Sequence, residues 1–196
     1  MNKNRLEAFS DGVIAIIITI MVLEIKTPES ANIEGFLILL PTIFGYFLSF
    51  MFVGIYWNNH HHLLHSASKV SPLIMWTNLN ILFWLSLVPF ATKWMDESHF
   101  DKFTVIVYAI LLLLCGLAYS FLSQAIYKSL DSNDRMKQVV KSKIKELFSI
   151  LLYSISIPIS FWNTKVSLAI FTIVAIVWII PSKAIEKELT RIKDEI

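Results

Sequence analysis

Long apolar runs recur along this chain, and they determine the solvent in which it can fold. Short polar segments separate the runs, several of which are long enough to form a membrane-crossing helix. Such a helix needs about 20 apolar residues to cross a hydrocarbon layer about 30 Å thick. Hydrophobic residues make up 56% of the chain and charged residues only 16%, far from the balance of a water-soluble domain. We therefore expect an all-α, multi-pass protein embedded in a lipid bilayer.

We predict six transmembrane helices that together form one domain over residues 1–196. Their expected spans are 8–25, 36–57, 72–94, 103–127, 144–162 and 165–182. The first span has a short apolar stretch and follows Lys3 and Arg5, as the apolar part of a signal peptide would. Glu7 and Asp11 argue against a signal peptide, and no small-residue cleavage site follows. We therefore interpret this segment as a helix with a polar end.

Lysine and arginine are distributed unevenly between the two sides that these spans define. The N-terminus, the second and fourth connections and the C-terminus carry thirteen of them, and the other side carries four. Cytoplasmic segments are enriched in basic residues, so both termini are expected in the cytoplasm and the protein in the cell membrane. The net charge of +2 does not indicate a nucleic-acid partner.

Prolines occur at several positions within or beside the spans. Pro72 suits a first helical turn, whereas Pro89 and Pro158 should kink their helices, because proline has no amide hydrogen to donate. The segment from 128 to 146 is polar and mostly basic. We expect it to be a partly helical cytoplasmic connection near anionic headgroups.

Two polar clusters stand where span 1 begins and span 2 ends. Ionisable groups inside a membrane are costly unless they are paired or hydrated, so each cluster indicates a structural or functional role. The first comprises Arg5, Glu7, Ser10 and Asp11, and the second comprises Trp57, Asn58, Asn59, His60, His61, His62 and His65. Both lie at the same depth, so Arg5 and Asp11 can reach the second cluster, and Asn78 in span 3 is near enough to join.

The histidines also raise the question of a metal. His61 and His65 are four residues apart on one helical face, but no Asp, Glu or Cys accompanies them at ligand spacing. We expect no fixed metal site and no cofactor, while a pH-sensing role for the histidines, His62 included, stays open. The chain has no phosphate-binding glycine loop, nucleophile elbow or zinc-protease pair, so an enzyme is not expected.

Span 1 carries an apolar stripe. Ile16, Ile20 and Leu23 follow the spacing i, i+4 and i+7, and Thr19 lies on the next row. Helix packing or lipid contact also explains such a stripe, so by itself it does not indicate a pore.

Three patterns in spans 1 to 3 resemble those of the transmembrane protein 175 family of potassium channels, in its short prokaryotic form. They are an RxxxFSD pattern, a WxxH pattern, and an asparagine followed by a Pro-Phe pair. In this chain they are formed by Arg5, Phe9, Ser10 and Asp11; by Trp57 and His60; and by Asn78, Pro89 and Phe90. Spans 4 to 6 match only in length and hydropathy.

This resemblance implies a potassium-permeable homotetramer with a central pore lined by the first helices and no TVGYG filter. Ile16 would form a hydrophobic constriction, with Thr19, Ile20 and Leu23 along the path and K+ passing transiently near Thr19. Ala15 replaces a small hydroxyl that some members carry, so strong selectivity for potassium is not implied. The remaining polar residues would hold span 1 in place rather than touch ions: Arg5, Phe9, Ser10, Asp11, Trp57, His60 and Asn78.

Other interpretations stay open. A proton-coupled or proton-conducting transporter could use Asp11 and His60 as a relay, although the inverted repeats and broken midplane helices common in transporters are not evident. A non-conducting scaffold is a third possibility. Glu24, at the outer end of span 1, is either an attractor of cations or an ordinary solvated acid.

Overall fold

The structure is a computed structural model that describes residues 2–131, 137, 140 and 143–179. All regular structure in these residues is helical, which confirms the all-α class. The helices are α1 (Lys3–Leu23), α2 (Ile33–His65), α3 (Pro72–Ser86), α4 (Val88–Glu97), α5 (Lys102–Ser129), α7 (Ile144–Ser160) and α8 (Thr164–Ile179). The end of predicted span 6, much of the basic connection after 131 and the C-terminal lysines lie outside the described residues.

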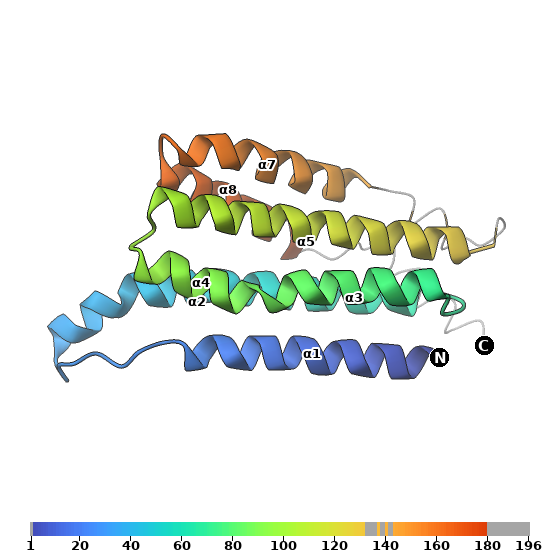
Figure 1. Cartoon of the computed structure of the whole chain (residues 1–196), viewed down its shortest axis with the longest axis horizontal. Helices are drawn as coiled ribbons and strands as arrows, with labels where there is room; N and C mark the ends of the chain where they lie inside the picture. The colour runs from blue at the N-terminus through green and yellow to red at the C-terminus, as the bar shows by residue number, and fades with distance from the viewer. Residues whose placement is uncertain (1, 132–136, 138–139, 141–142, 180–196) are drawn as a thin grey trace.

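The helices form a bundle of six rods, because α3 and α4 are separated only by Leu87 and continue one another (Figure 1). Four stretches in the described residues are long and apolar enough to cross a membrane: Lys3–Leu23, Ile33–His65, Pro72–Glu97 and Lys102–Ser129. Thr164–Ile179 is a shorter apolar helix. Successive rods alternate in direction, so α1 begins at the end of the bundle where α2 and α5 finish.

Two helices differ from their predicted spans for identifiable reasons. α2 continues to His65, eight residues past the expected end at 57, because polar side chains in its last turns contact α1 and α3. The α3–α4 rod breaks at Leu87, where Pro89 has no amide hydrogen for the carbonyl four residues earlier. Pro158 lies near the end of α7, which stops at Ser160.

α5 lies in the middle of the bundle, between α3 and α4 on one side and α7 on the other (Figure 1). Tyr108 on α5 packs on Phe171 of α8 with ring centroids 5.6 Å apart. Its hydroxyl lies 2.7 Å from the hydroxyl of Ser49 on α2, to which Thr92 of α4 donates a hydrogen bond of 2.7 Å. Three helices are thus joined by buried hydroxyls, as a lipid-embedded bundle requires of its polar groups.

α1 lies at the edge of the bundle against α2, α3 and α4, and its two faces differ. Its buried face repeats every three or four residues and comprises Leu6, Ser10, Ile14, Ile17 and Met21. The opposite face has no packing partner among the residues that the structure describes. α1 is therefore held on one side and open on the other.

Candidate functional site

The open face of α1 carries the predicted pore stripe. Ile16, Ile20 and Leu23 are 59%, 41% and 80% exposed, and Thr19 is exposed beside them. The Thr19 hydroxyl donates to the Ile16 carbonyl oxygen over 2.9 Å, so its oxygen keeps lone pairs that can face a cation. Beside the stripe, a groove of about 440 Å³ runs between α1 and the α3–α4 rod, with Pro89 and Phe90 on its far wall.

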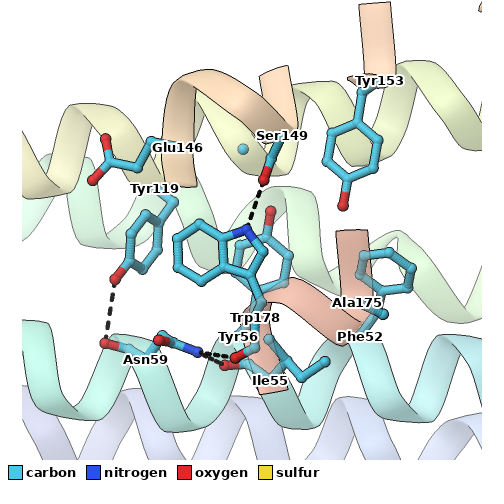
Figure 2. A pocket seen from close by; sticks show the side chains of 11 residues that line it. Phe52, Ile55, Tyr56, Asn59, Tyr119, Glu146, Ser149, Tyr153, Ala175 and Trp178 are labelled. Carbon is cyan, nitrogen blue, oxygen red and sulfur yellow. Dashed lines mark hydrogen bonds between the residues drawn. The ribbon is translucent and has the colours of Figure 1, made fainter. Parts of the chain in front are cut away.

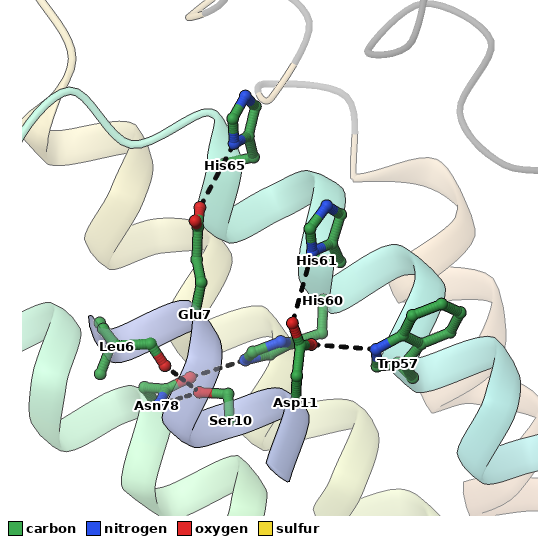
Figure 3. A network of polar contacts seen from close by, with 9 residues as sticks. All are labelled: Leu6, Glu7, Ser10, Asp11, Trp57, His60, His61, His65 and Asn78. Carbon is green, nitrogen blue, oxygen red and sulfur yellow. Dashed lines mark hydrogen bonds and ion pairs between the residues drawn. The ribbon is translucent and has the colours of Figure 1, made fainter. Parts of the chain in front are cut away.

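A buried chain of hydrogen bonds fixes the opposite face of α1 (Figure 3). The Asn78 amide nitrogen donates to the Ser10 hydroxyl over 2.9 Å, and Ser10 donates to the Leu6 carbonyl oxygen over 2.8 Å. His60 Nε2 lies 2.6 Å from the Asn78 amide oxygen and therefore carries the proton. One asparagine on α3 thereby links α1 to α2.

A second, more exposed set of contacts joins α1 and α2. The indole nitrogen of Trp57 donates to Asp11 over 2.9 Å, and His61 Nδ1 lies 3.9 Å from the other oxygen of that carboxylate. His65 Nδ1 lies 3.3 Å from the Glu7 carboxylate. Figure 3 shows the His61–Asp11 and His65–Glu7 pairs one above the other between the antiparallel helices α2 and α1.

The structure brings together five of the seven residues predicted to hold span 1: Ser10, Asp11, Trp57, His60 and Asn78. Arg5 and Phe9 are exposed, and the Arg5 side chain makes no hydrogen bond or ion pair within the described residues. Asp11 and His60, the two members of the alternative proton relay, belong to separate sets of contacts and do not bond to each other.

The sequence analysis did not predict the contact partners of three residues: Glu7, His61 and His65. The signal was available in the spacing: Glu7 and Asp11 are four residues apart, as are His61 and His65. Residues with this spacing share one helical face, so two antiparallel helices can pair them twice. No group of three or more His, Cys, Asp and Glu in the described part could hold a metal ion.

Charged residues also pair at the opposite end of α1. The Lys93 ammonium contacts the Glu24 carboxylate, and Lys26 contacts Glu97 over 2.8 Å. Both pairs link the residues just after α1 to α4; the Lys26–Glu97 pair is exposed and the Lys93–Glu24 pair is partly exposed. In this chain Glu24 is therefore partly neutralised by a neighbouring cation.

These features define the class of the protein, which is a multi-pass membrane protein. They are antiparallel apolar helices, an outward apolar stripe on the first helix and a polar network behind that stripe. Comparisons with known proteins make this more specific. Residues 5–89 match the family model described as endosomal/lysosomal potassium channel TMEM175. A potassium channel of Chryseobacterium sp. (strain P1-3) is 47% identical over 189 residues, which cover 96% of this chain and 98% of that one. The chain belongs to the TMEM175 family.

A solved structure and an animal relative extend the comparison. The structure of a lysosomal potassium-selective channel TMEM175 homologue from Chamaesiphon minutus has a TM-score of 0.76 at 26% identity, covering 90% of this chain and 95% of that one. The endosomal/lysosomal proton channel TMEM175 of Bos taurus is 34% identical over 96 residues, which are 42% of this chain and 20% of that protein. The likeness to the bacterial proteins therefore spans nearly the whole chain.

Proposed function

We propose that this protein is a potassium-permeable cation channel of the cell membrane, in which four chains surround a pore lined by α1. Ile16 forms the narrow constriction, and Thr19, Ile20 and Leu23 line the path beyond it. The observation that carries this proposal is the exposure of the stripe on a helix whose other face is fixed by buried hydrogen bonds. Membership of a channel family supports it.

The proposed mechanism is passive conduction without a TVGYG filter, a sequence that this chain lacks. A ring of four isoleucine side chains excludes water when narrow, which stops ion flow, and admits hydrated ions when slightly wider. The Thr19 hydroxyls then offer oxygen ligands to a partly dehydrated ion. The distribution of lysine and arginine supports a cytoplasmic location for both termini, and with them for the Asp11–Trp57 contact.

Potassium flux from liposomes tests the constriction. We expect the purified chain to release potassium down its gradient, and Ile16→Asn to raise that flux severalfold, because an amide ring stays hydrated. Ile38→Asn is the matched control, since Ile38 is exposed on α2 away from the stripe. Equal flux in wild type and Ile16→Asn would reject the constriction, and a mass in detergent that differs from four chains would reject the tetramer.

A proton-conducting or proton-coupled transporter that uses Asp11 and His60 is the second candidate, because the animal relatives are named proton channels. The same liposomes distinguish it when they contain a pH-sensitive dye. Potassium release that requires proton counterflow, and that His60→Gln abolishes, would favour this candidate. Release that ignores an imposed pH gradient would favour the potassium channel.

A further inference from the structure

The helices on either side of α1 each carry a row of exposed apolar side chains. α2 contacts one flank of α1, where Trp57 donates to Asp11. The α3–α4 rod borders the other flank along the groove beside Ile16 and Ile20 (Figure 1). No helix in the described part of the chain covers either row. Each row therefore meets lipid or a second protein chain.

The row on α2 follows the spacing of a helix that packs against a partner helix. Steps of four and three residues separate its first members, whose side chains are 44% to 70% exposed: Ile33, Leu37, Leu40, Phe44 and Phe47. Phe50 follows three residues later and is 38% exposed. Such steps keep side chains on one side of a helix, where they can interdigitate with those of a second helix. These six residues form the α2 row.

The α3–α4 rod carries a similar row on its own outer side. Steps of three and four residues again separate its exposed members: Trp76, Leu79, Phe83, Ser86, Phe90 and Trp94. Five of them are large and apolar, with side chains 37% to 72% exposed. Ser86 and Phe90 also line the groove beside α1. These six residues form the rod row.

The two rows overlap in depth within the bundle. Thr92 on α4 donates a hydrogen bond of 2.7 Å to Ser49 on α2, which aligns the two helices inside the chain. Phe50 adjoins Ser49, and Phe90 precedes Thr92 by two residues, so the two rings stand near one level. Rotation about a pore axis parallel to the bundle keeps each residue at its depth. Phe50 of one chain can therefore meet Phe90 of the next chain.

The groove beside α1 is a hollow that this chain leaves unfilled. Its volume is about 440 Å³, and its walls include Ile16 and Ile20 on α1 and Phe90 on the rod. The cavity between α2, α5, α7 and α8 measures only about 20 Å³ by the same measure, because the chain's own aromatic rings close around it beside Glu146 (Figure 2). The chain thus packs its interior away from α1 and leaves space next to α1.

A ring of four chains needs a heterologous contact, in which two different surfaces of the chain meet. When α1 is nearest the axis, α2 and the α3–α4 rod are the surfaces on its two sides. Each α2 then faces the rod of the neighbouring chain. The α2 row and the rod row are the two different surfaces that such a ring requires.

We propose that the α2 row of one chain docks against the rod row of a second copy, with Phe50 beside Phe90 and α2 covering the groove. This inference rests on the proposed ring around α1 and adds which surfaces hold the ring together. The covered groove also borders Ile16, so the interface sets the position of the proposed constriction.

Disulfide crosslinking between two differently tagged chains tests the docking in cell membranes. One chain carries Phe50→Cys, the other carries Phe90→Cys, and both carry Cys115→Ala, so only a bond between chains can form. We expect copper phenanthroline to produce a covalent heterodimer, because a disulfide requires Cα atoms within about 7 Å of each other. Each cysteine variant expressed alone should give no dimer, since the contact joins two different surfaces.

Ile155→Cys replaces Phe90→Cys in the matched control. Ile155 is 41% exposed on α7, two residues after Tyr153, whose ring packs on Phe52 of α2. Its depth is therefore close to that of Phe50, but it lies on the side of the bundle away from α1. We expect several times less heterodimer with this control than with Phe90→Cys.

Phe47→Cys with Trp94→Cys is a second pair, one turn nearer the outer end, which should also form a heterodimer if the first pair disturbs folding. The mass in detergent and the potassium flux are measured in parallel. A conducting tetramer that forms neither heterodimer, or forms as much with Ile155→Cys, would overturn the docking and leave the pore proposal standing. A monomer without either crosslink would overturn both proposals and assign the two rows to lipid.

Discussion

His60 and Asn78 are 18 residues apart in sequence, and their side chains share a buried hydrogen bond of 2.6 Å between α2 and α3. Because Asn78 also donates to Ser10, this one side chain connects the three N-terminal rods. The packed face of α1 thus depends on a polar group at the bundle's interior.

Replacing Asn78 should therefore loosen α1. Asn78→Ala leaves the buried Nε2 of His60 without its acceptor and removes the hydrogen bond that the Ser10 hydroxyl accepts. We expect a loss of about 1–3 kcal/mol in the free energy of unfolding. The measurement is thermal or denaturant unfolding in detergent. Asn80→Ala, on the same helix and half-buried, should change stability far less. Similar losses in both variants would contradict the role assigned to Asn78.

Removing the Asp11 carboxylate should impair assembly or gating. Asp11→Ala deletes the acceptor for Trp57 and the partner of His61, so we expect fewer tetramers or altered potassium flux. Trp57→Phe should act in the same direction but less strongly, because the His61 contact remains. Unchanged expression, tetramer and flux in Asp11→Ala would refute this prediction. Glu29→Ala, in the exposed connection after α1, is the control.

Releasing Glu24 from its ion pair should change conduction rather than stability. Lys93→Gln removes the cation that contacts Glu24, so the end of α1 next to Glu24 becomes more negative and should attract cations. We expect a larger potassium flux at low ionic strength that returns to the wild-type value at high salt, where charges are screened. Lys102→Gln removes an exposed lysine at the start of α5 and should not reproduce the effect.

Two glycines of α2 should respond oppositely to the same substitution. At Gly35 an added methyl would overlap the Ser30 carbonyl oxygen, so Gly35→Ala must shift the start of the helix, and we expect a loss of roughly 1–3 kcal/mol in the free energy of unfolding. At Gly54 the space is open, and alanine should stabilise the helix by up to about 1 kcal/mol. Unfolding measurements on both variants check this prediction. Equal changes in the free energy of unfolding would show that the connection before α2 moves to make room for the methyl at Gly35.

The fold was largely predictable because membrane helices are recorded in local sequence. Apolar runs predicted the helical class, and Pro89 predicted the break between α3 and α4. The end of α2 was not predictable in the same way, since most residues from Asn58 to His65 are polar. Their contacts with neighbouring helices, among them α1 and α3, are visible only in the structure.

The candidate site was predictable in composition but not in pairing. The sequence indicated that Asp11 would meet the polar end of α2, yet its partners are Trp57 and His61, while His60 turns to Asn78. The hydroxyl contacts of Ser49 with Tyr108 and Thr92 gave no sequence signal, because serine and threonine are common in membrane helices.

The sequence alone determined that the chain belongs in a bilayer, that it crosses as helices, and that its basic residues gather on one side. These properties depend on residue types and their spacing along a single segment. Only the tertiary structure decided which face of α1 is buried and which is open, and that Glu146 borders an aromatic cavity. Those outcomes depend on how each helix is rotated against its neighbours. Packing between segments that are distant in sequence determines this rotation, and hydropathy along one segment does not reveal it.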